Sequence, residues 1–457
     1  MKSIFVNIDL TQGSISKGML KFAVPLMLGN IMQQLYNIVD TLVVGRYIGR
    51  NALAAVGSAY TLTVLITSVI SGLCMGSSTW IAMQYGQKDD FNMKRSCFQS
   101  FVGIAAVAAG INLFVFCTIG RIAAFMQIPA EVRGDFLQYL NILFWGIPAV
   151  FLYNYFANLL RATGNAALPV VSIAVSAISN IFLDLIFVLK LNMGVRGAAA
   201  ATVIAQYLSG GILLAYYMIK CGHLHLSKEH MRWDTANVKQ IFSLSFLTCI
   251  QQSVMNFGIL LVQGIVNSFG SVIMAAFAAA VKIDTLAYAP VQDFGNAYST
   301  YVAQNYGAGQ QDRIRKGSRI SVAMVIVFCI LTSALVCVFA ENLMGLFLKA
   351  DQTDIIAAGC NYLRIEGACY TGIGLLFLLY GYFRAIKRPF ISLVLTVVSL
   401  GTRVILAAWL SQIPSVGVNG IWLSIPAGWL LADLLGGICI RAYRPAGLRK
   451  NAGGLNG

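Results

Sequence analysis

Twelve long apolar segments run through the chain and restrict the folds open to it. Each is long enough to cross a bilayer as a helix, since about 20 apolar residues span the hydrocarbon core. The segments cover approximately residues 17–45, 52–83, 97–122, 136–160, 166–190, 196–220, 240–268, 272–304, 318–341, 356–383, 389–411 and 417–440. Because the connections are mostly short, we expect no soluble domain. The sequence predicts an all-α polytopic membrane protein with twelve transmembrane helices.

The composition agrees with this prediction. Of the 457 residues, 58% are hydrophobic and only 11% are charged, whereas charged residues make up about 25% of a soluble protein. The N-terminus lacks the order of charged, apolar and small residues found in a cleaved signal peptide. The first apolar segment is therefore expected to anchor the mature protein.

The net charge of +15 is distributed unevenly over the connections. The N-terminal end, the even-numbered loops and the C-terminal tail hold 22 of the 32 Lys and Arg residues, and the odd-numbered loops hold 7. Cytoplasmic loops are enriched in Lys and Arg. We therefore expect both termini in the cytoplasm, and the charge indicates topology rather than a nucleic-acid partner.

Cysteine and histidine give no sign of a metal site. The 10 cysteines are scattered singly along the apolar segments, and no C-x-x-C or cysteine–histidine spacing occurs. We interpret them as small buried hydrophobic residues. The three histidines, His223, His225 and His230, share one loop, which is expected to be a solvated linker, with a pH sensor as the alternative.

The second half of the chain repeats the first at an offset near 220 residues. Each half holds six apolar segments, so the repeats run parallel, as they do in several transporter folds. Four groups of residues recur in order: Gly45 and Gly49 as Gly264 and Gly270, Tyr85-Gly86 as Tyr306-Gly307, Arg161-Ala162 as Arg384-Ala385, and Gly194-Val195 as Gly417-Val418. We therefore expect an N-terminal lobe at 1–220, a cytoplasmic linker at 221–237 and a C-terminal lobe at 238–457.

The first apolar segment carries a polar stripe with a carboxylate. Gln33, Tyr36, Asn37 and Asp40 fall on one face at helical spacing. A carboxylate in the middle of a bilayer costs about 2.5–3.5 kcal/mol on insertion scales. Pro25 lies upstream in the same segment and favours a kink. The stripe therefore predicts a kinked helix with an inward-facing acid.

Other segments of the first half carry polar residues four positions apart, which also share a helix face. They are Ser172, Ser176, Asn180 and Asp184 in the fifth segment, Thr202 and Gln206 in the sixth, and Asn154 and Asn158 in the fourth. In lipid each polar group needs an internal partner, so these side chains form either a cluster around the two aspartates or ordinary contacts between helices. Two aspartates that share a site have coupled titrations, which suits a proton carrier.

The second half is polar in a different way. Its first segment has no acid. The residues proposed to line a substrate cleft are Asn154, Asn158 and Gln206 of the first half together with Gln252, Asn256, Asp284, Asp293 and Glu366 of the second. No phosphate-binding glycine loop of the Walker type occurs, so ATP is not expected to drive the protein, and no cofactor is expected beyond a coupling ion.

Together these motifs resemble the multidrug and toxic compound extrusion family, MATE. The resemblance rests on QQLYNIVDTLVVGRYIG at 33–49 after Pro25, NALAAVG at 51–57, QYG at 84–86, RATGN at 161–165 and GVRGAA at 194–199. It covers essentially the whole chain. It implies a V-shaped fold of two six-helix lobes that exports bulky cationic or amphipathic compounds.

The pair Asp40 and Asp184, with Asn180 four residues before Asp184, resembles the DinF-like prokaryotic branch. That resemblance implies cation coupling in the first lobe, at Gln33, Tyr36, Asp40, Asn154, Asn180, Asp184 and Thr202. The NorM-type branch has acids in the first segment of its second half and in its tenth segment. Here the first of these is missing, although Glu366 remains in the tenth.

We accordingly expect a monomeric antiporter in a bacterial inner membrane, in contact with lipid. A buried carboxylate pair suits a proton, while the extra oxygen donors equally suit a small hard cation such as sodium. Two alternatives stay open: a flippase for lipid-linked precursors in the same superfamily, which needs a cationic cleft, and an integral-membrane transferase enzyme, which needs a histidine–aspartate pair or an acidic metal site.

Overall fold

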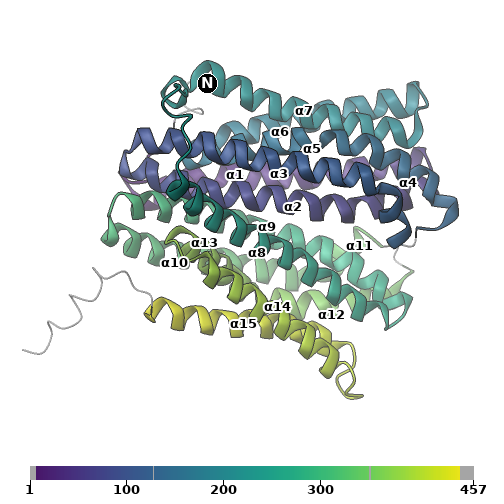
Figure 1. The fold of residues 1–457 in the computed structure, drawn as a ribbon. Coiled ribbons are helices and arrows are strands. Elements are labelled where there is room, and N and C mark those ends of the chain that lie inside the picture. The colour runs from purple at the N-terminus through teal and green to yellow at the C-terminus, as the bar shows by residue number, and fades with distance from the viewer. Residues whose placement is uncertain (1–6, 127, 349–350, 443–457) are drawn as a thin grey trace, which may run out of the picture. The chain divides into compact units, whose positions relative to one another are not determined.

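The computed structural model describes residues 7–126, 128–348 and 351–442, and within these ranges the chain is helical, without a β-strand (Figure 1). The longer helices are α1 (Ile15–Tyr47), α2 (Arg50–Gln87), α3 (Asp90–Phe125), α4 (Ala130–Leu143), α5 (Ile147–Ala162), α6 (Ala167–Asp184), α7 (Gly194–Lys220), α8 (Thr235–Asn267), α9 (Ser271–Gly307), α10 (Gln311–Val338), α12 (Thr353–Gly367), α13 (Tyr370–Ala385), α14 (Pro389–Leu410) and α15 (Asn419–Ala442). The shorter ones are α11 (Ala340–Gly345), the 3₁₀ turns η1 (Phe144–Gly146) and η3 (Gly222–Leu224), and the π-helical η2 (Leu185–Lys190).

These helices form the twelve expected segments. Among the described residues, 10 helices are long and apolar enough to cross a membrane, counting α4 with α5 and α6 with η2 as one each. The pair α12 and α13, bent by 51° at its break, makes a further broken span. Helix α1, with 33 residues and Pro25 inside it, is the remaining segment. The predicted all-α membrane fold is confirmed.

By compactness the chain divides into two units. Unit 1 comprises Met1–Asp9 and Leu28–Cys249, and unit 2 comprises Leu10–Met27 and Ile250–Gly457. The division therefore runs through helices α1 and α8 and not through the loop at 221–237. The predicted lobe boundaries, which take that loop as a linker, stay a prediction.

The parallel repeat is visible in the backbone. Residues with positive φ, which end or begin helices, recur at matching places in the two halves. The matching pairs are Gly49 and Gly270, Lys88 and Gly309, Gly164 and Lys387, and Gly194 and Gly417. Each half thus turns its chain at the same four points, whether or not glycine is available there.

The loop at 221–237 is tied to unit 1 by polar contacts at the start of α3. Arg95 donates to Asp234 at 3.0 Å, and Gln99 donates to the carbonyl of Arg232 at 3.2 Å. Asn237 donates to the side chain of Gln99 at 2.7 Å. The described residues of this loop are mostly exposed, as expected of a solvated linker, and its second half is in addition held by these hydrogen bonds.

Candidate functional site

The polar stripe of α1 leads into the interior of unit 1. Asp40 is buried, with 9% of its surface exposed, and Tyr36 is half-buried. Gln33, two helical turns before Asp40, is exposed. The face predicted from the spacing is therefore correct for Tyr36 and Asp40, and the structure does not place Gln33 in the buried cluster.

Asp40 on α1 meets Asp184 on α6. The two carboxyl groups lie within hydrogen-bonding reach of each other. Asp184 is almost fully buried, and the chain changes from α-helix to the π-helical η2 immediately after it. Short π-helical stretches are frequent at functional sites. Because ionised carboxylates have no donor, a hydrogen bond between these two groups needs one proton.

Asn180 and Thr202 complete the polar surroundings of Asp184. Asn180 lies one turn before Asp184 on α6, and its amide nitrogen donates to Asp184 Oδ2 at 2.9 Å in the orientation that satisfies both amide atoms. Its oxygen then accepts from the backbone N–H of Thr202 on α7 at 3.3 Å. The Thr202 hydroxyl donates to the carbonyl of Ala198 at 3.0 Å. These contacts orient Asp184 toward α1.

Two tyrosines border the carboxyl pair. Tyr36 of α1 and Tyr139 of α4 both lie close enough to Asp40 and Asp184 to interact electrostatically, and both reach the hydroxyl of Thr202. Tyr139 is buried and was missed by the sequence reasoning. The one polar residue three or four positions from it, Asp135, precedes the predicted apolar segment, so spacing within that segment gave no signal for Tyr139.

No basic side chain balances this cluster within the described part of the chain. Neither aspartate has an ion pair with Lys, Arg or His. The Oδ1 atoms of Asp40 and Asp184 are buried without a hydrogen-bond partner. A buried carboxylate pair without a counter-ion can take up a proton or a small cation. Among the residues that the structure describes, no group of three or more His, Cys, Asp or Glu could hold a metal ion.

The remaining candidates of unit 1 are used locally. Asn154 and Asn158 donate to carbonyls one turn earlier on their own helix, each at 2.8 Å. Ser176 joins α6 to α7 by donating to the carbonyl of Ala205 at 2.7 Å. Gln206 borders a cavity of about 20 Å³, where its buried Oε1 has no partner. That volume suits one water molecule.

Unit 2 contains a second buried acid cluster with a different composition. Asp284 of α9 and Glu366 of α12 are both buried and interact with each other. Tyr362 reaches both carboxyl groups, and Tyr370 faces Asp284. Arg403 of α14 acts electrostatically on both acids. Its positive charge partly offsets the two acids, although Arg403 forms no ion pair with either of them among the described residues.

The other candidates of unit 2 lie outside that group of side chains. Gln252 and Asn256 are half-buried on α8, and Asp293 is half-buried on α9, three residues after Pro290. Gln251, the neighbour of Gln252, is the buried one, with 2% exposure. A substrate-lining role for these residues stays a prediction.

Comparison with known sequences identifies the family. The sequence model of the MatE family matches residues 25–186 and again residues 247–409, once in each half of the chain. The chain is 29% identical over 435 residues to "Probable multidrug resistance protein YpnP" of Bacillus subtilis, covering 93% of this chain and 94% of that protein. It is 24% identical to a "FAD transporter" of Shewanella oneidensis, covering 94% of each.

Comparison with solved structures agrees on the fold. An outward-facing multidrug resistance MATE transporter of the MOP superfamily matches with a TM-score of 0.90 at 21% identity, over 95% of this chain and 97% of that one. A MOP superfamily transporter from Pyrococcus furiosus matches with a TM-score of 0.89. The chain belongs to the MatE family, and it is accordingly a multi-pass membrane transporter and not an enzyme.

Proposed function

We propose that this protein is an antiporter that exports organic cations and amphipathic drugs in exchange for a cation bound by Asp40 and Asp184. The observation that carries the proposal is the meeting of these two carboxyl groups inside unit 1 with no basic partner among the described residues. Burying two like charges in contact is unfavourable, so the empty pair tends to bind a cation. A permanently compensated pair would lack that property.

The contact between the carboxyl groups favours a proton over sodium as the coupling ion. A proton completes a hydrogen bond between the two groups without moving either. A sodium ion needs several oxygen ligands. The Thr202 hydroxyl is one candidate, and Asn180 supplies another only if its amide turns over, since its nitrogen faces Asp184. Sodium is therefore the alternative ion, and binding it requires the carboxyl groups to separate.

Neutralisation of the pair is proposed to release α1. Asp40 belongs to α1, and Pro25 removes a backbone hydrogen bond from the same helix. Loss of charge on Asp40 lets this helix shift, which releases bound drug, and rocking of the two lobes then exposes the empty site to the other side. One charge crossing 100 mV supplies about 2.3 kcal/mol, enough for a gradient of roughly fiftyfold.

The substrate class is proposed from the relatives. Several are named as multidrug resistance or multidrug export proteins.

By the distribution of Lys and Arg we place both termini in the cytoplasm of a bacterium, with the chain acting as a monomer in the inner membrane. The main alternative, export of an anion such as a lipid-linked diphosphate, needs a cationic cleft. Arg364, one of the arginines within the spans, is exposed and paired with Glu341 at 3.1 Å. Its charge is therefore not free to line such a cleft.

An efflux assay tests the proposal. Wild type, Asp40→Asn and Glu131→Gln are expressed in a bacterium that lacks its own drug pumps, and ethidium accumulation is measured at equal expression. Wild type is expected to lower accumulation, because the charged pair couples export to the ion gradient. Asp40→Asn is expected to accumulate ethidium like the empty vector. Glu131, exposed at the start of α4, is the matched acid control and should behave as wild type.

Two outcomes contradict the proposal. If wild type lowers the accumulation of no organic cation in a panel, drug export is wrong. If Asp40→Asn exports as well as Glu131→Gln, the coupling role of the pair is wrong. Proteoliposomes with an imposed proton or sodium gradient then identify the ion, since only the true coupling gradient drives ethidium transport.

A further inference from the structure

The two units differ sharply at one set of equivalent positions. In unit 1, aromatic rings fill the space where α3, α5 and α7 meet. The rings are Phe101, Phe151, Tyr155, Phe156 and Tyr217, with centroids 5.1–6.1 Å apart. The Tyr155 hydroxyl also donates to the carbonyl of Cys97 at 2.6 Å. This part of unit 1 is thus closed by rings and a hydrogen bond.

In unit 2 the same helix positions carry smaller side chains. Val322 stands where Phe101 stands, counted from the first residue of α10 and of α3. Leu378 and Leu379 replace Tyr155 and Phe156, counted from the last residue of α13 and of α5. Ile440 replaces Tyr217, counted from the matching glycines that precede or begin α15 and α7.

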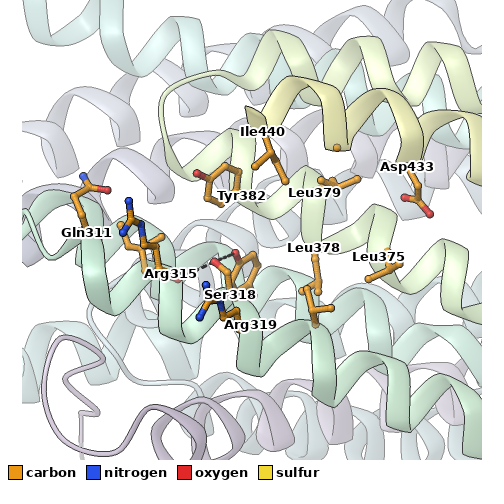
Figure 2. Close-up of a pocket in the computed structure, with 14 residues that line it drawn as sticks. Gln311, Arg315, Ser318, Arg319, Leu375, Leu378, Leu379, Tyr382, Asp433 and Ile440 are labelled. Atoms are coloured by element: carbon orange, nitrogen blue, oxygen red, sulfur yellow. Dashed lines mark hydrogen bonds between the residues drawn. The ribbon is translucent and has the colours of Figure 1, made fainter. Parts of the chain in front are cut away.

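A cavity of about 580 Å³ occupies this place in unit 2, and all four of these aliphatic residues line it (Figure 2). That volume lies within the range of small-molecule binding pockets. At the equivalent place in unit 1 aromatic rings fill the space among the described residues. We infer that it accommodates a ligand, and its lining shows which kind.

The cavity is polar at its ends and apolar between them. Figure 2 shows Gln311, Arg315 and Arg319 of α10 toward one end and Asp433 of α15 at the other. Arg315 has a weak contact with the exposed Asp312 at 3.9 Å, and Arg319 has no ion pair among the described residues. Two guanidinium groups one helical turn apart suit a phosphate, which they bind by paired hydrogen bonds.

The flanking helices present apolar surface beside the cavity. Val322 lines it and is itself exposed, and Ile330 and Leu331 follow on the exposed surface of α10. On α15, Leu434 and Ile438 are exposed on either side of the lining residue Gly437. In a membrane protein such exposed apolar faces contact acyl chains, so a ligand can enter from the lipid phase.

We propose that this cavity binds an anionic phospholipid, with the phosphate at Arg315 and Arg319 and an acyl chain along Leu375, Leu378 and Leu379. The arginines lie at the end of unit 2 where α10 begins and α15 ends, which is the Lys- and Arg-rich side. With the orientation proposed above, this is the cytoplasmic leaflet, where basic pockets between helices hold anionic head groups.

Charge favours this occupant over an organic cation. The cavity carries two arginines against one carboxyl group, so the field near its polar end is positive. Asp433 lies among apolar residues at the far end, where its buried Oδ1 has no hydrogen-bond partner. A carboxyl group there disfavours a phosphate at that end and so fixes the direction of the lipid, with the head group at the arginines.

Lipid binding is measured on the purified full-length protein in non-ionic detergent by native mass spectrometry and thermal shift. Phosphatidylglycerol is compared with phosphatidylcholine of the same acyl chains, and with soluble glycerol phosphate. Wild type is expected to retain phosphatidylglycerol selectively. The double variant Arg315→Gln/Arg319→Gln is expected to bind it about thirtyfold more weakly, since each basic residue near anionic lipid contributes about 1 kcal/mol.

Lys316→Gln removes a neighbouring exposed charge on α10 that does not line the cavity, and should bind as wild type does. A second variant, Val322→Phe/Leu379→Phe, installs the rings of unit 1 and should lose the lipid although both arginines remain. Its thermal midpoint without lipid serves as the folding check.

Three results overturn the proposal: equal retention of phosphatidylcholine, equal stabilisation by glycerol phosphate, or unchanged binding in both double variants. Binding of tetraphenylphosphonium that is abolished by Asp433→Asn but not by the arginine changes would assign the cavity to an organic cation instead. Lipid binding is measured without transport, so a failure of the proposed drug export would not decide whether the cavity binds lipid.

Discussion

Unit 1 and unit 2 share a helix plan but treat their buried acids in opposite ways. In unit 1, Asp40 and Asp184 face each other with no basic partner among the described residues. In unit 2, Asp284 and Glu366 share the field of Arg403. A nearby positive charge lowers the tendency of an acid pair to bind a further cation. The contrast therefore supports the proposal that unit 1 exchanges the coupling ion.

The two units also differ in how completely side chains fill the space between their outer helices. Unit 1 is closed by aromatic rings between α3, α5 and α7, whereas unit 2 keeps a cavity at the same helix positions. After duplication, the half with the uncompensated acids has the more tightly filled periphery. The half with compensated acids has room for a lipid.

The largest expected effect tests whether Arg403 stabilises the acids of unit 2. Arg403→Gln removes a positive charge that acts on two buried carboxyl groups, and two unit charges just beyond 4 Å apart interact by up to about 4 kcal/mol at an effective dielectric constant of 20. We expect the free energy of unfolding in detergent to fall by about 3 kcal/mol. Thermal or denaturant unfolding measures it.

The matched control is Arg364→Gln. Arg364 and Glu341 form an exposed pair at 3.1 Å, and exposed pairs contribute about 0–1 kcal/mol. Equal stability of Arg403→Gln and Arg364→Gln would show that the acids of unit 2 do not depend on Arg403, and the contrast between the units would be lost.

A backbone contrast sharpens the same comparison. Gly164 in unit 1 and Lys387 in unit 2 occupy matching positions with φ of 94° and 63°. A Cβ on Gly164 would strike the backbone oxygen of Ile8. Gly164→Ala is therefore expected to cost about 2 kcal/mol or more, and Lys387→Gly should change stability by less than about 1 kcal/mol. Unfolding midpoints of both variants, compared with wild type, measure this. The interpretation fails if the two changes have equal effects.

The smallest expected effect concerns the loop held by unit 1. Backbone N–H donors of Asn237 and Ala236, with Arg95, lower the pKa of Asp234 below its usual value. The contribution of the charged group is present above the unfolded pKa and is lost as pH falls through the lowered pKa. Hydrogen exchange of 226–237, corrected for intrinsic rates, should lose protection in acid in wild type but change little with pH in Asp234→Asn. Identical pH profiles of hydrogen exchange in wild type and Asp234→Asn would contradict a stabilising role of Asp234 in this loop.

The membrane fold could be predicted from the sequence because it follows from a one-dimensional pattern, whereas the pairing of Asp40 with Asp184 was implied by the resemblance to the DinF-like branch. Segment length gives the spans, and helical spacing puts Tyr36 and Asp40 on one face. Spacing does not say which helices become neighbours, so Tyr139 was missed. It also cannot measure reach along the axis: Gln33 shares the face of Asp40 but lies two turns away and is exposed.

The sequence pattern also could not show that a cavity in unit 2 takes the place of the aromatic rings in unit 1. Val322 and Leu379 are ordinary apolar residues in their helices, and only the packed repeat shows that Phe101 and Phe156 fill the equivalent space. Similarly, Asn154 and Asn158 looked like cluster members by spacing, yet each donates to its own helix.

The most direct test of the central claim is infrared difference spectroscopy of the purified transporter in lipid, recorded on adding substrate or changing pH. We predict a protonated-carboxyl band that responds in wild type and in Glu366→Gln, and that disappears in Asp40→Asn and in Asp184→Asn. A band that survives in both aspartate variants, or that vanishes in Glu366→Gln alone, would contradict the assignment of ion exchange to unit 1.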